Sequence, residues 1–150
     1  MPESEVGRPI EILLVEDSPT DTLLTCEAFE NSKLLNRIHA VGDGEAAMAF
    51  LRRNHPYEDS PRPDLVLLDL NLPKKSGREV LRDIKDDDAL KSIPIVILTS
   101  SKDEQDVVKA YGLHANCYIT KPVGFAGLSE CVQAINEFWF AVVTLPTRRS

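Results

Sequence analysis

The alternation of short apolar runs with longer segments of helical periodicity constrains the fold of this chain more than any other feature. The apolar runs are residues 10–15, 37–41, 64–70, 93–98 and 116–120. Several of them are almost continuously hydrophobic, as expected for strands that are covered on both faces. Between them, apolar residues recur at spacings of three and four, which indicates helices. The pattern predicts an α/β domain with a doubly wound, five-stranded parallel sheet and helices on both faces.

Capping residues predict where the helices begin. Ser18, followed by Pro19, predicts the N-cap of the first helix. Further helices are expected after Asp43-Gly44, after Ser76-Gly77, over 101–111 and over 125–142. The side chains predicted to face the sheet from the first three helices are Leu23, Leu24 and Ala28, then Ala47, Phe50 and Leu51, then Val80, Leu81 and Ile84.

The length and charge of the chain limit the number of domains and the kinds of partner that we expect. With 150 residues, it is expected to form one domain over 10–145, with a flexible N-terminus at 1–9, a tail at 146–150 and no output domain. The net charge of −7 argues against nucleic-acid binding, which needs a basic surface. The apolar runs are too short to cross a membrane, and the acidic N-terminus does not resemble a signal peptide. A cytoplasmic location is therefore expected.

Polar residues follow the predicted strands where each strand ends. Glu16 and Asp17 close the first strand, Asp69 the third, Thr99 the fourth and Lys121 the fifth. In a doubly wound parallel sheet the carboxyl ends of the strands share one edge, so these side chains are expected to converge. If the first and third strands are neighbours, the three acids repel one another and require a cation. Carboxylate oxygens favour Mg²⁺.

Such a cluster has the chemistry of a phosphoryl-accepting site. Asp69 would attack phosphorus as the nucleophile, while the metal, the Lys121 ammonium and the Thr99 hydroxyl stabilise the phosphoryl oxygens. The small Ser100 leaves room beside Thr99. A simpler reading, in which a carboxylate after a strand only caps the next helix, is open for Asp43 and for Glu16.

These motifs resemble the receiver domains of two-component response regulators. The matching stretches are Val15-Glu16-Asp17, 67–73 with Gly77, Leu98-Thr99-Ser100 and 118–122. The resemblance implies a flavodoxin-like fold with strand order 2-1-3-4-5 and self-catalysed phosphorylation of Asp69, not turnover of a separate substrate. It also implies the following site: Mg²⁺ held by Glu16, Asp17, Asp69 and the main-chain carbonyl of Asn71, phosphoryl contacts from Lys121, Thr99 and Ser100, and a switch pair of Thr99 and Tyr118.

Within that family, the chain is similar to the single-domain response regulators of cyanobacterial and bacterial phytochromes. The stretches that carry this likeness are 61–64, 72–81, 113–118 and 138–140. The resemblance implies a histidine kinase partner of the phytochrome type and a homodimer. The apolar end of the last predicted helix suggests dimer contacts at Phe138, Phe140 and Val143. Without an output domain, the signal is expected to leave through an effector protein or by onward phosphotransfer.

Two alternatives stay open at the level of sequence. A metal-dependent phosphatase of the haloacid dehalogenase kind also uses an aspartate at a strand end, but it generally needs a second aspartate two residues later for proton transfer. Here that position is Asn71, whose amide cannot transfer a proton in this way. The other alternative is a degenerate receiver that serves only as a binding module, although none of the expected acids, Thr99 or Lys121 is missing.

Overall fold

A parallel five-stranded sheet forms the centre of the computed structural model, which describes residues 9–31, 35–70, 72–99 and 117–120, together with residues 133 and 137. The strands are β1 (Ile10–Val15), β2 (Asn36–Val41), β3 (Leu65–Asp69), β4 (Ile95–Thr99) and β5 (Cys117–Thr120). Their order in the sheet is β2-β1-β3-β4-β5, and every neighbouring pair is parallel. The predicted fold class and strand order are therefore confirmed.

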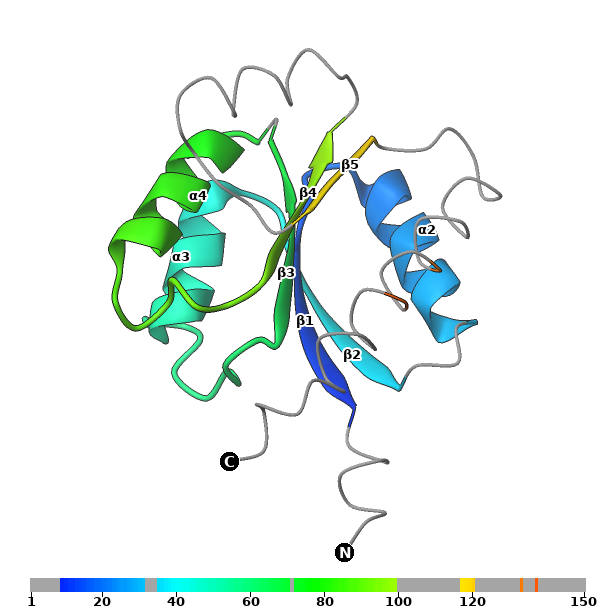
Figure 1. Cartoon of the computed structure of the whole chain (residues 1–150), viewed down its shortest axis with the longest axis horizontal. Coiled ribbons are helices and arrows are strands. Elements are labelled where there is room, and N and C mark those ends of the chain that lie inside the picture. Colours follow the sequence, from blue (N-terminus) through cyan, green and yellow to red (C-terminus); the bar gives the residue numbers. More distant parts are fainter. Residues whose placement is uncertain are drawn as a thin grey trace, which may run out of the picture.

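Three described helices cover the two faces of the sheet. Helix α2 (Pro19–Glu30) lies on one face, while α3 (Gly44–Arg52) and α4 (Gly77–Asp86) lie on the other (Figure 1). The Ser18 hydroxyl accepts a hydrogen bond from the Asp21 amide at 3.2 Å, and Ser76 forms a capping box with Glu79. The helix starts predicted at Ser18, Asp43 and Ser76 are thus confirmed.

Successive residues of β1 point to opposite faces of the sheet and enter two separate hydrophobic layers. Ile12 and Leu14 pack with Ala28 and Phe29 of α2. Residues on the other face of the sheet join α3 and α4, in a layer whose helix members are Ala47, Met48, Phe50, Leu51, Val80, Leu81 and Ile84. Every side chain predicted to face the sheet from α3 and α4 is buried there.

One residue predicted to face the sheet from α2 does not. Leu23 is 61% exposed, whereas Ala28 is buried and Leu24 packs partly against the core. The buried stripe of α2 runs through Leu24, Thr25, Ala28 and Phe29, and each residue turns about 100° around the helix axis. Leu23 therefore falls one step outside the stripe, on the solvent side.

The beginning of β4 also differs from the prediction, which placed it at residue 93. The Ile93 amide donates to the Leu90 carbonyl at 3.0 Å and so closes a turn, and Pro94 has no amide hydrogen to donate. The strand therefore starts at Ile95.

Several expectations concern residues that the structure does not describe. The helices predicted over 101–111 and 125–142 and the terminal segments 1–9 and 146–150 fall almost entirely outside the described residues. Within the described part of the chain, no helix has both the length and the apolar character needed to cross a membrane.

Candidate functional site

Strand register brings the predicted acidic residues together at the carboxyl edge of the sheet. Val15 of β1 pairs with Leu68 of β3, so the residues that follow them, Glu16 and Asp69, lie side by side where the strands end. Carboxylate oxygens of Glu16, Asp17 and Asp69 all lie within 4.8 Å of one another. Glu16 and Asp69 are only 4% and 5% exposed, while Asp17 faces solvent. The predicted convergence of the three acids is thus present in the structure.

The proximity of these carboxylates gives the cluster an affinity for cations. Two unit charges 4.8 Å apart repel by about 3.5 kcal/mol at an effective dielectric constant of about 20, and three carboxylates repel in three pairs. Burial of two of them adds a desolvation cost that a bound cation offsets. The donors are hard carboxylate oxygens, and solvent reaches the cluster at Asp17. This donor set fits a divalent ion such as Mg²⁺, which keeps several of its waters.

The start of α2 holds Glu16 in place. Its Oε2 atom accepts a hydrogen bond from the Ser18 amide at 3.2 Å, and its own amide donates to the Val41 carbonyl of β2 at 3.0 Å. Ser18 in turn caps α2. The Glu16 side chain therefore does two things: it accepts a hydrogen bond at the start of α2, and it belongs to the acidic cluster.

Asp43 serves as a helix cap, as the simpler reading of the sequence suggested. Its Oδ1 atom accepts from the Ala46 amide at 2.7 Å, at the start of α3. Its Oδ2 atom lies 3.6 Å from the ammonium nitrogen of Lys74. Asp43 therefore links α3 to the segment after β3 and is not part of the three-carboxylate cluster.

Two glycines allow close backbone contacts around the start of α4. The Gly77 amide donates to the Leu70 carbonyl at 3.1 Å, and a Cβ atom on Gly77 would lie 2.6 Å from the Leu70 Cα. A Cβ atom on Gly44 would lie 2.7 Å from the Lys75 carbonyl carbon. Lys74, which directly precedes Lys75, has a left-handed backbone with a φ of 66°. These contacts fix the path of the chain directly after Asp69.

A salt bridge reinforces the same segment. The Lys75 ammonium lies 2.7 Å from Oδ2 of Asp83, one turn and a half into α4. This hydrogen bond raises the pKa of Lys75 above its usual value, because it stabilises the charged form of the lysine. Sequence reasoning did not find the Gly44, Lys74 and Lys75 contacts; the only signals were the pairs Asp43-Gly44 and Ser76-Gly77 at the two helix starts.

The remaining predicted site residues are placed only in part. Thr99 is the last residue of β4, and its backbone pairs with Thr120; Tyr118 pairs with Ile97. The other predicted site and dimer residues lie outside the described residues, and they are Asn71, Ser100, Lys121, Phe138, Phe140 and Val143.

Comparison with known proteins agrees with this geometry. Residues 12–133 match the model of the response regulator receiver domain. Response regulator Rcp1 of Synechocystis sp. is 51% identical over 142 residues, which cover 95% of this chain and 97% of Rcp1.

Two solved structures of related proteins have the same fold. The crystal structure of the Mn²⁺-bound form of Rcp1 aligns with a TM-score of 0.81 at 52% identity, covering 92% of this chain and 99% of that one. The phosphorylated cyanobacterial phytochrome response regulator RcpA aligns with a TM-score of 0.83 at 49% identity, covering 93% and 99%. The chain therefore belongs to the family of response regulator receiver domains, which are signalling proteins and not enzymes that turn over a separate substrate.

Proposed function

We propose that this protein accepts a phosphoryl group on Asp69 in a Mg²⁺-dependent phosphorelay and passes the signal on by protein contact. The observation that carries the proposal is the convergence of Glu16, Asp17 and Asp69 at the carboxyl edge of the sheet. Two relatives support it, because one was solved with Mn²⁺ bound and another in a phosphorylated form.

The proposed reaction is an in-line displacement at phosphorus. An Asp69 carboxylate oxygen forms the new P–O bond while the P–N bond to the phosphohistidine of a kinase breaks, and the electron pair leaves with the imidazole nitrogen, which takes up a proton. Glu16, Asp17 and Asp69, with the Asn71 carbonyl, would hold Mg²⁺. When bound, the ion neutralises negative charge on the carboxylates and phosphoryl oxygens. In this proposal Lys121, Thr99 and Ser100 contact the phosphoryl oxygens.

We expect Asp17→Asn to weaken divalent-ion binding without disturbing the fold. Asp17 is the exposed member of the cluster, so its substitution removes a charged ligand but no buried contact. Loss of one charge-assisted ligand interaction corresponds to a loss of affinity of about tenfold or more. The measurement is a Mg²⁺ titration of each protein followed by NMR, together with phosphoryl labelling from a small phosphodonor with and without Mg²⁺.

Asp59→Asn provides the matched control, because it removes the same charge from an exposed connector residue. The control should bind Mg²⁺ like the wild type. Equal affinity in all three proteins would show that the acidic cluster is not the metal site, and labelling of the wild type that persists in excess chelator would show that phosphorylation does not depend on Mg²⁺.

The proposed donor is a phytochrome-type histidine kinase. The support is the likeness to RcpA, which is described as a phytochrome response regulator, and to Rcp1. We propose that Thr99 and Tyr118 form the switch pair, in which the threonine hydroxyl moves to the phosphoryl group and the tyrosine ring follows. The resulting change in surface would be read by an effector protein or followed by onward phosphotransfer.

We further propose a homodimer that uses Phe138, Phe140 and Val143. The support is the apolar sequence of this stretch, which is typical of a partner surface. Sedimentation of the wild type should show a dimer, and Phe140→Asp should shift it to a monomer, because burial of an unpaired carboxylate at an interface is costly. A wild type that stays monomeric at high concentration, with and without a phosphoryl mimic, would exclude the dimer.

A further inference from the structure

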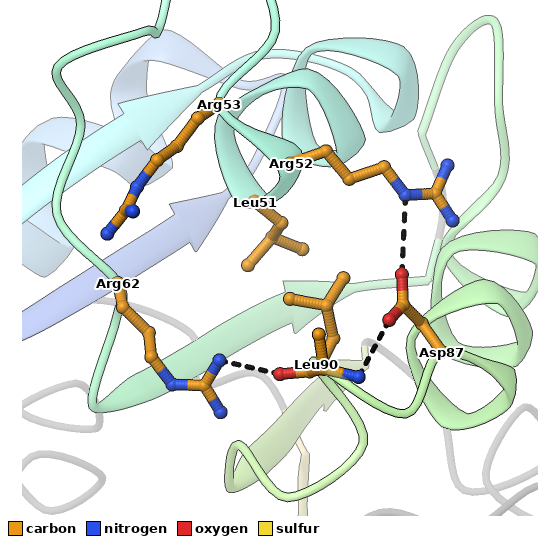
Figure 2. Close-up of a pocket in the computed structure, with 7 residues that line it drawn as sticks. Leu51, Arg52, Arg53, Arg62, Asp87 and Leu90 are labelled. Atoms are coloured by element: carbon orange, nitrogen blue, oxygen red, sulfur yellow. Dashed lines mark hydrogen bonds and ion pairs between the residues drawn. The ribbon is translucent and has the colours of Figure 1, made fainter.

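A pocket lies at the far end of α4 from the acidic cluster. Helix α4 begins where Gly77 packs against the backbone of Leu70, and it ends at Asp86, so its ten residues span about 15 Å. The pocket has a volume of about 360 Å³ and is lined by Leu51, Arg52, Arg53, Arg62, Asp87, Ala89 and Leu90 (Figure 2).

The pocket combines an apolar centre with a cationic rim. Figure 2 shows Leu51 and Leu90 between the arginines, with Arg53 and Arg62 on one side and Arg52 on the other. Both leucines belong to the hydrophobic core and are less than one-tenth exposed. The lining holds three arginines and one aspartate, so it carries a surplus of positive charge on a chain whose net charge is −7.

Hydrogen bonds fix the arginines but leave part of their donor capacity unused. Arg62 donates to the Ala89 carbonyl at 2.6 Å and to the Ser92 hydroxyl at 3.2 Å. Within the described part of the chain, Arg53 donates its Nε to the Ser60 carbonyl at 2.9 Å and makes no further hydrogen bond through its side chain.

Arg52 is held by an ion pair instead. It places its Nε 3.6 Å from Asp87. Among the residues that the structure describes, none accepts from the Nη nitrogens of Arg52 or Arg53. Two positioned guanidinium forks are thus available to an anion.

We propose that this pocket binds a small organic phosphate of the nucleoside monophosphate class. Guanidinium forks match the paired oxygens of a phosphate, and guanidinium planes stack on flat rings. The exposed edges of the two leucines offer the base of such a ligand an apolar contact. The volume lies near the lower end of the range for small-molecule sites, about 300–1,000 Å³, which agrees with a ligand of this size.

The position of Arg52 at the C-terminus of a helix offers a purely structural explanation for one arginine. A cation in the last turn of α3 complements the helix dipole, and Arg52 also pairs with Asp87. That explanation does not extend to Arg53. Its side chain lies on the same side of the leucines as Arg62 and extends toward the segment that carries Arg62 (Figure 2), and its Nη nitrogens have no acceptor among the described residues.

The test is an NMR titration of the whole protein with adenosine monophosphate, without divalent ions. Saturable shifts are expected at the amides of 51–53, 62 and 87–90. Adenosine alone and inorganic phosphate alone should bind at least about tenfold more weakly, because adenosine lacks the phosphate group and inorganic phosphate lacks the base.

Arg53→Gln and Arg52→Gln should each weaken binding by about tenfold, the equivalent of one lost charge-assisted hydrogen bond. Arg37→Gln is the matched control, since Arg37 lies on β2 with a side chain that is 66% exposed, and its substitution changes the net charge equally. The control should bind like the wild type.

Three results would overturn the proposal. The first is the absence of saturable shifts at the pocket, whether no residue shifts at all or only the residues around Asp69 shift. The second is an Arg53→Gln protein that binds as tightly as the Arg37→Gln control. The third is inorganic phosphate binding as tightly as the nucleotide, which would show that the pocket does not recognise the base.

Discussion

Asp69→Asn will abolish phosphoryl incorporation and leave the fold intact. The amide has nearly the shape of the carboxylate, but its neutral oxygen is a poor nucleophile and it lacks the charge that attracts a metal ion. Asp69 is 5% exposed at the end of β3, within 4.8 Å of two other acids, so the substitution also removes like-charge repulsion. In the absence of metal, the free energy of unfolding should therefore stay equal or rise, with two repulsive pairs of about 3.5 kcal/mol each as the upper bound.

The measurement is the intact mass of the wild type and the variant after incubation with a phosphorylated kinase or a small phosphodonor in Mg²⁺. Asp59→Asn is again the control and should be labelled like the wild type. Equal labelling of the Asp69→Asn protein would refute the assignment of the phosphoacceptor. If the wild type takes up no phosphate from any donor, the chain is a receiver that acts only as a binding module.

Gly77→Ala will destabilise the protein and slow the phosphorylation of Asp69. A Cβ atom at this position would lie 2.6 Å from the Leu70 Cα and still closer to the Asp69 carbonyl oxygen, so the backbone must move. Overpacking of this kind costs about 1–3 kcal/mol. The higher helix propensity of alanine recovers up to about 1 kcal/mol, so the net effect is a loss of stability.

Urea unfolding of Gly77→Ala and Gly42→Ala separates this steric effect from a general effect of replacing glycine. A Cβ atom on Gly42 would have no neighbour within 4 Å, so that variant should keep wild-type stability. The labelling rate of Gly77→Ala should fall as well, because the displaced backbone carries Asp69. Wild-type stability and rate in the Gly77→Ala protein would show that the helix can shift at no cost.

The fold could be predicted because its signals are local and periodic. Continuous apolar runs indicate strands that are buried on both faces, and capping residues such as Ser18 and Ser76 indicate where helices begin. Neither signal requires knowledge of tertiary contacts. The prediction for Leu23 was wrong because a short amphipathic pattern does not fix the rotation of the helix by one residue. The misplaced start of β4 reflects a turn closed by Ile93.

The acidic cluster could be predicted for a different reason. A parallel sheet places the carboxyl ends of its strands on one edge, so the positions of Glu16, Asp17 and Asp69 after their strands are enough to predict that they converge. The contact of Gly44 with Lys75 and the arginine pocket could not be predicted in this way. Each depends on how two loops meet in space, and no periodic pattern in the sequence encodes that distance.

The two glycine contacts have a consequence for changes in chain length. Because Gly77 packs against Leu70 and Gly44 packs against Lys75, inserting or deleting a single residue between Leu70 and Ser76 would disturb one of these contacts and shift Asp69 relative to its neighbouring acids. The turn at residues 55–59, by contrast, is largely exposed. A peptide tag or a fluorescent reporter is therefore better accommodated at that turn than beside the acids.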